Sequence, residues 1–129
     1  GNPLSMAVAK AVLYDVLTPE TYRELGRLER RMAEGAEQIV ARYGLPARVV
    51  TAGAKGSITY SPVPLKNYRQ FLALDGRYPY CAWLFQYNGG VFLPPWSKGE
   101  QWMLSVQHTD ADVDRYLETL ERFALAIGR

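Results

Sequence analysis

Residues 90–115 read GVFLPPWSKGEQWMLSVQHTDADVDR, and this stretch predicts how the second half of the chain folds. Val91–Leu93 is short and apolar, and the two prolines that follow indicate a strand that ends there. After a polar loop, Trp102–Val106 predicts a second strand. Thr109 then reads as a helix cap, because two aspartates follow it at the positive end of the expected helix.

Apolar residues at helical spacing predict helices elsewhere in the chain. Residues 2–17 form the first, with an Asn cap, a first-turn Pro and one buried face. Residues 18–44 form a long amphipathic helix that a glycine ends, and residues 77–88 form a shorter one before two glycines. The last helix continues its apolar face from Thr109 to Ile127.

Two further strands are expected in the middle of the chain. Residues 48–51 and 57–60 are short, rich in β-branched side chains and separated by glycines. Residues 67–75 fit either a short helix or a loop. The fold class is therefore α+β, with residues 1–129 as one domain. A small antiparallel or mixed sheet of three to four strands is expected, covered by the two N-terminal helices and the C-terminal helix.

Composition narrows the classes of function. The chain has 129 residues, 48% of them hydrophobic and 22% charged, which suits one domain with a core. No apolar run reaches the length of a membrane span, and a net charge of +2 leaves no basic stripe for nucleic acid. One Cys and one His give no cluster for a metal site. The composition fits a cytoplasmic protein.

Single reactive residues predict little chemistry when each is taken alone. His108 precedes a helix cap and is expected to be a structural hydrogen-bonding residue, since no nucleophile pairs with it. The turn at residues 53–57 lacks the spacing of a P-loop. The aromatic residues between 78 and 87 are expected in the core or at a partner surface. The remaining candidates are expected to be solvated ammonium groups: Lys10, Lys55, Lys66 and Lys98.

An ordered set of motifs covers nearly the whole chain. It consists of GNPLSM at the start, Gly56-Ser57-Ile58, the segment from Asn67 to Asp75, and residues 90–115 with Glu100 and His108-Thr109-Asp110. This set resembles the C-terminal part of the class III, pyridoxal-phosphate-dependent aminotransferases, the family that includes glutamate-1-semialdehyde 2,1-aminomutase.

The resemblance implies a fold, a cofactor and partners. The chain would be the C-terminal small domain of a fold type I enzyme, beginning in mid-protein after a large domain that holds pyridoxal 5'-phosphate and its Schiff-base lysine. The complete enzyme would be a cytoplasmic homodimer that transfers an amino group within or between small amino-acid or amine substrates, as in tetrapyrrole biosynthesis. This fragment alone would be inactive.

The resemblance also implies site residues. Glu100 would be catalytic, by hydrogen-bonding or balancing charge around the amino groups that are exchanged. Gly1 and Asn2 would be cofactor-binding, because they shape a turn near the cofactor phosphate of the neighbouring subunit. The loop 96–99 is one residue longer than in the aminomutase, and Ile58 replaces a Met, which leaves open a different substrate.

A rival hypothesis belongs to another class of function. The chain would be a free-standing α+β interaction module derived from such a domain, without catalysis. Its large apolar face would then self-associate or bind another partner, because monomers seldom expose extended apolar patches.

Overall fold

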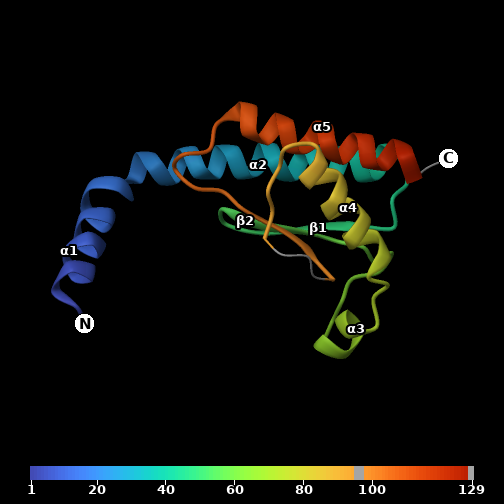
Figure 1. The fold of residues 1–129 in the computed structure, drawn as a ribbon, viewed down its shortest axis with the longest axis horizontal. Helices are drawn as coiled ribbons and strands as arrows, with labels where there is room; N and C mark the ends of the chain where they lie inside the picture. Colours follow the sequence, from blue (N-terminus) through green and yellow to red (C-terminus); the bar gives the residue numbers. More distant parts are fainter. Residues whose placement is uncertain (95–97, 128–129) are drawn as a thin grey trace.

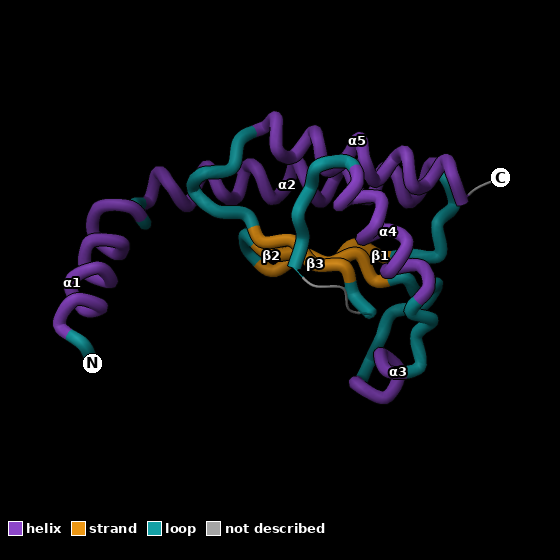
Figure 2. Tube along the Cα trace, viewed as in Figure 1, coloured by secondary structure: helices purple, strands orange, loops and turns teal. Residues whose placement is uncertain are grey.

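The computed structural model describes residues 1–94 and 98–127. The helices are α1 (Pro3–Ala11), the π-helical segment η1 (Val12–Val16), α2 (Pro19–Arg42), α3 (Tyr68–Leu72), α4 (Arg77–Asn88) and α5 (Asp110–Ile127). The strands are β1 (Arg48–Ala52), β2 (Lys55–Thr59) and β3 (Glu100–Met103). Figure 2 shows the three strands as one small sheet beneath the helices.

The sheet of the described residues is antiparallel throughout, in the order β1-β2-β3. β1 and β2 form a hairpin whose turn begins at Gly53, where φ is 60°, a left-handed conformation that glycine adopts without strain. Val49 lies opposite Ile58, and Gly56 lies opposite Trp102. The predicted α+β class with a small antiparallel or mixed sheet of three to four strands is confirmed, as three antiparallel strands in the described residues.

The core lies between the sheet and the pair α2 and α5, which run side by side with α4 packed on α5 (Figure 1). Each helix contributes one apolar stripe, as its sequence periodicity predicts. The buried hydrophobic side chains of these two helices are Leu28, Met32, Ala36, Ile39, Val113, Tyr116, Leu120, Phe123 and Ala124. The sheet contributes Ile58 and Trp102 from the opposite side.

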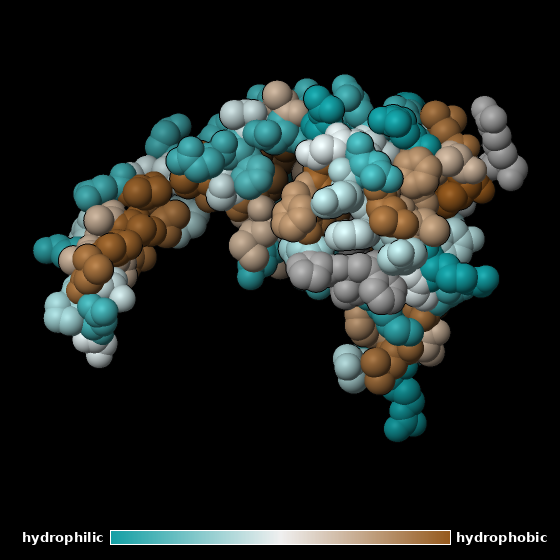
Figure 3. Space-filling model, viewed as in Figure 1, coloured by the Kyte–Doolittle hydropathy of each residue, from teal (hydrophilic) through white to brown (hydrophobic). Residues whose placement is uncertain are grey.

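The first helix forms where expected, and the Asn2 side chain accepts a hydrogen bond from the Leu4 backbone N–H at 2.9 Å. Its predicted burial is wrong, because no side chain is buried anywhere in residues 3–16, all of which are described. Figures 1 and 3 show α1 leading away from the body with its apolar side uncovered. The helical spacing of apolar residues shows that one face of a helix is apolar, but it does not show which segment packs against that face.

The segment Val91–Leu93 is not a strand, which corrects the prediction from its apolar run. The Val91 N–H donates to the carbonyl of Gln86 at 2.9 Å, so the backbone continues from the end of α4 and does not join the sheet. Leu93 is buried in the core without strand pairing, whereas Phe92 is exposed.

Two other element boundaries differ from or refine the sequence-based predictions. β3 starts two residues before the predicted strand and ends at Met103, after which the Leu104 N–H donates to the Ala54 carbonyl at 2.8 Å. The open alternative at 67–75 is a short helix, α3, where the Asn67 side chain accepts from the Gln70 N–H at 3.0 Å.

Among the described residues, no helix is long and apolar enough to cross a membrane.

Candidate functional site

Glu100, the predicted catalytic residue, is the first residue of β3, and its backbone lies opposite Ile58 of β2. Its side chain lies outside the described part of the structure, so its role stays a prediction. β3 is an edge strand of the sheet in the described residues. The backbone just before Glu100 is buried, because Gly99 lies close to Ser57 and Phe71, with Ser57 Oγ 3.4 Å from where a Cβ would stand.

Gly1 and Asn2, the predicted cofactor-binding residues, are exposed at the free end of α1 (Figure 1). Asn2 caps α1 through its side chain, a role that the sequence predicts. α1 leads away from the sheet that carries Glu100, so this chain does not bring the two predicted parts of the site together. A contact of Gly1 and Asn2 with a cofactor stays a prediction about the assembled protein.

Lys98 is the residue of this region that sequence reasoning missed. Its ammonium Nζ donates to the backbone carbonyls of Leu72 and Leu74, each at 2.6 Å. The prediction of a freely solvated ammonium is therefore wrong for Lys98. No local signal could have shown these bonds, because the acceptors are carbonyls at the end of α3, 24 and 26 residues away along the chain.

An anionic side chain lies in the same neighbourhood. The Asp75 carboxylate accepts from the Arg77 Nε at 2.9 Å and from the Arg77 backbone N–H at 2.9 Å. The hydrogen bonds from the Arg77 side chain lower the pKa of Asp75 to about 2, with a smaller contribution from the positive charge of Lys98. Asp75 is therefore ionised at neutral pH beside the Lys98 ammonium.

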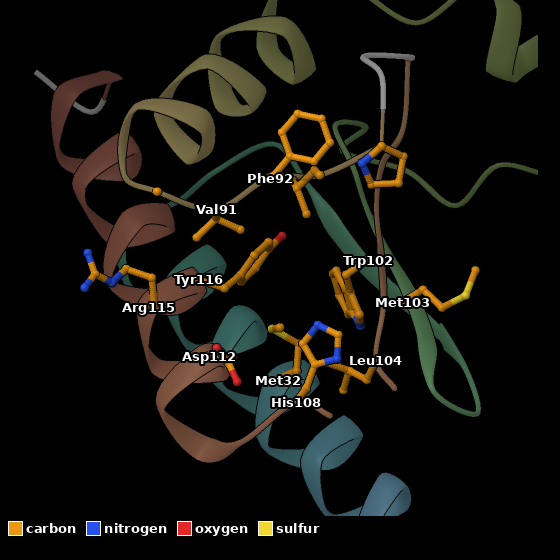
Figure 4. A pocket seen from close by; sticks show the side chains of 13 residues that line it. Met32, Val91, Phe92, Trp102, Met103, Leu104, His108, Asp112, Arg115 and Tyr116 are labelled. Carbon is orange, nitrogen blue, oxygen red and sulfur yellow. The ribbon is translucent and has the colours of Figure 1, made fainter. Parts of the chain in front are cut away.

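A separate pocket of about 290 Å³ lies between β3, α5 and the segment after α4 (Figure 4). Its walls are mainly apolar, and His108, Asp112 and Arg115 supply polar groups. Among the described residues that line it, none is a lysine, a serine or a cysteine. The described lining can therefore hold a small apolar group but supplies no lysine, serine or cysteine nucleophile. Its apolar lining includes Met32, Val91, Phe92, Trp102, Leu104 and Tyr116.

His108 has the structural role that its position before a helix predicts. Its Nδ1 accepts a hydrogen bond from the Ser105 backbone N–H at 3.0 Å, and the Ser105 hydroxyl lies 2.9 Å from the same nitrogen. In the neutral ring the proton therefore resides on Nε2. At the start of α5 the Thr109 N–H donates to the Asp112 carboxylate at 2.7 Å, and this hydrogen bond lowers the pKa of Asp112.

No family model matches the chain, but individual proteins do. The chain is 35% identical over 122 residues to glutamate-1-semialdehyde 2,1-aminomutase 2 of Geobacillus kaustophilus, which covers 95% of this chain and 28% of that protein. It is 31% identical over 129 residues to glutamate-1-semialdehyde 2,1-aminomutase of Bacillus subtilis, covering 100% of this chain and 30% of the relative. The chain thus spans less than a third of the length of these relatives.

Solved structures share the fold at lower identity. A glutamate-1-semialdehyde aminomutase from Pseudomonas aeruginosa, solved with PMP, superposes with a TM-score of 0.87 at 23% identity, over 95% of this chain and 27% of that one. A β-phenylalanine aminotransferase from Variovorax paradoxus gives a TM-score of 0.80 at 22% identity, over 97% of this chain and 28% of that one.

The α+β arrangement of β1 to β3 under α2 and α5 is therefore the fold of a domain of the pyridoxal-phosphate-dependent aminotransferases. The relatives that share 35% and 31% identity with the chain over almost its whole length are both aminomutases. Over almost its whole length the chain is similar to one part of glutamate-1-semialdehyde 2,1-aminomutase.

Proposed function

We propose that this chain is the C-terminal domain of a cytoplasmic pyridoxal-phosphate-dependent enzyme that transfers an amino group within or between small molecules. The observation that carries the proposal is the 35% identity to an aminomutase over 95% of this chain. Because the match spans only 28% of the relative, the complete protein would contain a large domain in addition.

The exposed apolar side chains of α1 and η1 support a partner that covers them in the complete protein. Leu4, Met6, Leu13 and Tyr14 are each more than 60% exposed, although helices of soluble domains usually bury such side chains. We assign the cover of this helix to the large domain and to the second subunit of a homodimer. Gly1 and Asn2 would then lie at the cofactor phosphate of that second subunit.

We assign the Schiff-base lysine of the cofactor to the large domain and not to this chain. A Schiff base requires a lysine amine that is free to react. Lys98 donates its ammonium protons to two carbonyls, and Lys10, Lys55 and Lys66 are exposed on the surface. The cofactor would therefore be held by the large domain, and this domain would contribute Glu100 to the substrate side.

The test is the cofactor content of the full-length gene product. Purified protein is expected to show a visible absorbance band that borohydride abolishes, and to be a dimer by light scattering. The isolated 129-residue chain is the matched control and is expected to show no such band. A full-length protein that takes up no pyridoxal phosphate would refute the proposal and favour the interaction module without catalysis.

A further inference from the structure

Lys98 makes an unusual contact for a loop lysine. The C-terminal end of a helix leaves carbonyls without intrahelical partners, and α3 ends at Leu72. The Lys98 ammonium donates to Leu72 O and Leu74 O at 2.6 Å each, which satisfies two acceptors with one cation. Hydrogen bonds from a charged donor are shorter and stronger than neutral ones, and a cation is favoured at this helix end.

The two residues after Lys98 are also held by remote segments. Gly99 is buried, with Ser57 of β2 and Phe71 of α3 in van der Waals range of its missing side chain. Glu100 begins β3 opposite Ile58 of β2. Lys98 therefore contacts the end of α3, Gly99 contacts side chains of α3 and β2, and Glu100 pairs with β2 in the sheet.

We propose that Lys98 is a positioning residue, which holds the start of β3 against α3 and so sets where Glu100 meets the substrate. The part of this inference that concerns substrate rests on the proposed function, because the role of Glu100 comes from there. The part that concerns the backbone rests on the Lys98 contacts alone. The five-residue helix α3 thereby helps to fix the position of the backbone at Glu100.

The first experiment measures amide hydrogen exchange by NMR on the 129-residue chain. Lys98→Met removes the ammonium donors but keeps much of the side-chain stem. The Leu74 N–H bonds to Phe71 O at the end of α3, and its exchange is expected to rise roughly tenfold as that end loosens. Lys98→Arg keeps a cationic donor and is expected to stay near the original rate.

Lys55→Met is the matched control, because Lys55 is exposed on β2. Its effect on Leu74 exchange is expected to be negligible. An unchanged Leu74 rate in Lys98→Met would overturn the proposal, as would an equal rise in the Lys55→Met control. This experiment needs neither cofactor nor activity, so its result is independent of the proposed function.

The second experiment separates positioning from general stability in the full-length enzyme. Lys98→Met is expected to lower kcat roughly tenfold with pyridoxal phosphate still bound, and Lys98→Arg is expected to restore most of it. In a Glu100→Gln background the further loss is expected to vanish, because Lys98 acts through Glu100. An equal loss in both backgrounds would overturn the positioning role.

The two proposals fail in different ways. If the full-length protein takes up no cofactor, the proposed function fails, and the positioning of Glu100 at a substrate falls with it. If cofactor binds and turnover is normal in Lys98→Met, the proposed function stands and the inference on Lys98 is refuted.

Discussion

The indole ring of Trp102 lies directly over Gly56 on the neighbouring strand, in the space that a side chain at position 56 would occupy. The two residues are opposite each other in the β2–β3 register, and Trp102 is only 4% exposed. A Cβ built on Gly56 would overlap Cζ2 and Cε2 of the indole. The absence of a side chain at Gly56 is therefore what lets a large aromatic ring close this side of the core.

Gly56→Ala is expected to destabilise the chain by about 1–3 kcal/mol, because the buried ring must move to admit a methyl group. Urea unfolding followed by Trp fluorescence measures this. Gly26→Ala is the matched control, since the added Cβ would meet only Arg30 Nη1, at 3.6 Å. In the interior of α2 this control is expected to stabilise by about 0.5–1 kcal/mol. Equal stability of Gly56→Ala and the unsubstituted chain would contradict the packing argument.

Arg27 of α2 donates to both carboxylate oxygens of Asp110 on α5, at 2.8 and 3.0 Å. These hydrogen bonds are the main cause of the lowered pKa of Asp110, and the charges of Arg27 and Arg31 add to it. Because the folded pKa lies below the unfolded one, the carboxylate stabilises the fold above the unfolded value of about 3.9. This contribution is lost as the pH falls through the folded value.

Asp110→Asn is accordingly expected to lower the urea midpoint at pH 6 and to have a shrinking effect as the pH falls below about 4. The effect is expected to be small, because both partners are about half exposed, and to shrink in 1 M salt. Glu118→Gln, exposed on the same helix and without an ion pair in the described part of the chain, is the control. A difference for Asp110→Asn that is constant from pH 6 to pH 2 would rule out this linkage.

The uncovered helix α1 and segment η1 allow a contrast between exposed and buried leucines. Leu13 is 63% exposed and Leu28 is 1% exposed. In the 129-residue chain, Leu13→Gln is expected to change the free energy of unfolding by less than about 0.5 kcal/mol. Leu28→Ala is expected to cost about 2–5 kcal/mol, because it leaves a cavity between α2 and α5.

The same Leu13→Gln substitution is expected to weaken the full-length protein, where the proposed large domain and second subunit cover this helix. Thermal unfolding and light scattering of both lengths measure the difference. A full-length protein that tolerates Leu13→Gln as well as the isolated chain does would mean that Leu13 stays exposed after assembly.

Glu100→Gln in the full-length enzyme keeps the size of the side chain and removes its negative charge. We expect kcat to fall by roughly tenfold or more, since each 1.4 kcal/mol of lost transition-state stabilisation costs a factor of ten. Steady-state assays with a semialdehyde and with simple amine donors measure this. Glu37→Gln, exposed on α2, is the control and is expected to leave turnover unchanged. Normal kinetics in Glu100→Gln would reject the catalytic role.

Features that depend on near neighbours in the chain could be predicted from the sequence. The predicted caps at Asn2 and Thr18 each accept a hydrogen bond from a backbone N–H two or three residues ahead. The hairpin at Gly53 and the amphipathic stripe of α2 are equally local. The prediction is least accurate at Val91–Leu93, where Leu93 is buried without strand pairing, because an apolar run alone does not show that a segment joins a sheet.

The candidate site could be predicted only in its most local part. The ordered motifs indicate the family and single out Glu100, but they do not show what holds the backbone on which it stands. The bond from Lys98 to Leu72 joins residues 26 positions apart, and nothing in the composition of either segment marks the other.

The sequence by itself determined most of the helices and strands of this protein, the caps at Asn2 and Thr18 and the class of its fold, because these follow from side-chain periodicity and from contacts within a few residues. Tertiary structure alone decided that Trp102 covers Gly56, that Lys98 binds the end of α3, and that α1 is left without cover. Such contacts join segments that are far apart in the chain, and the local spacing of residues does not show which remote segments come into contact.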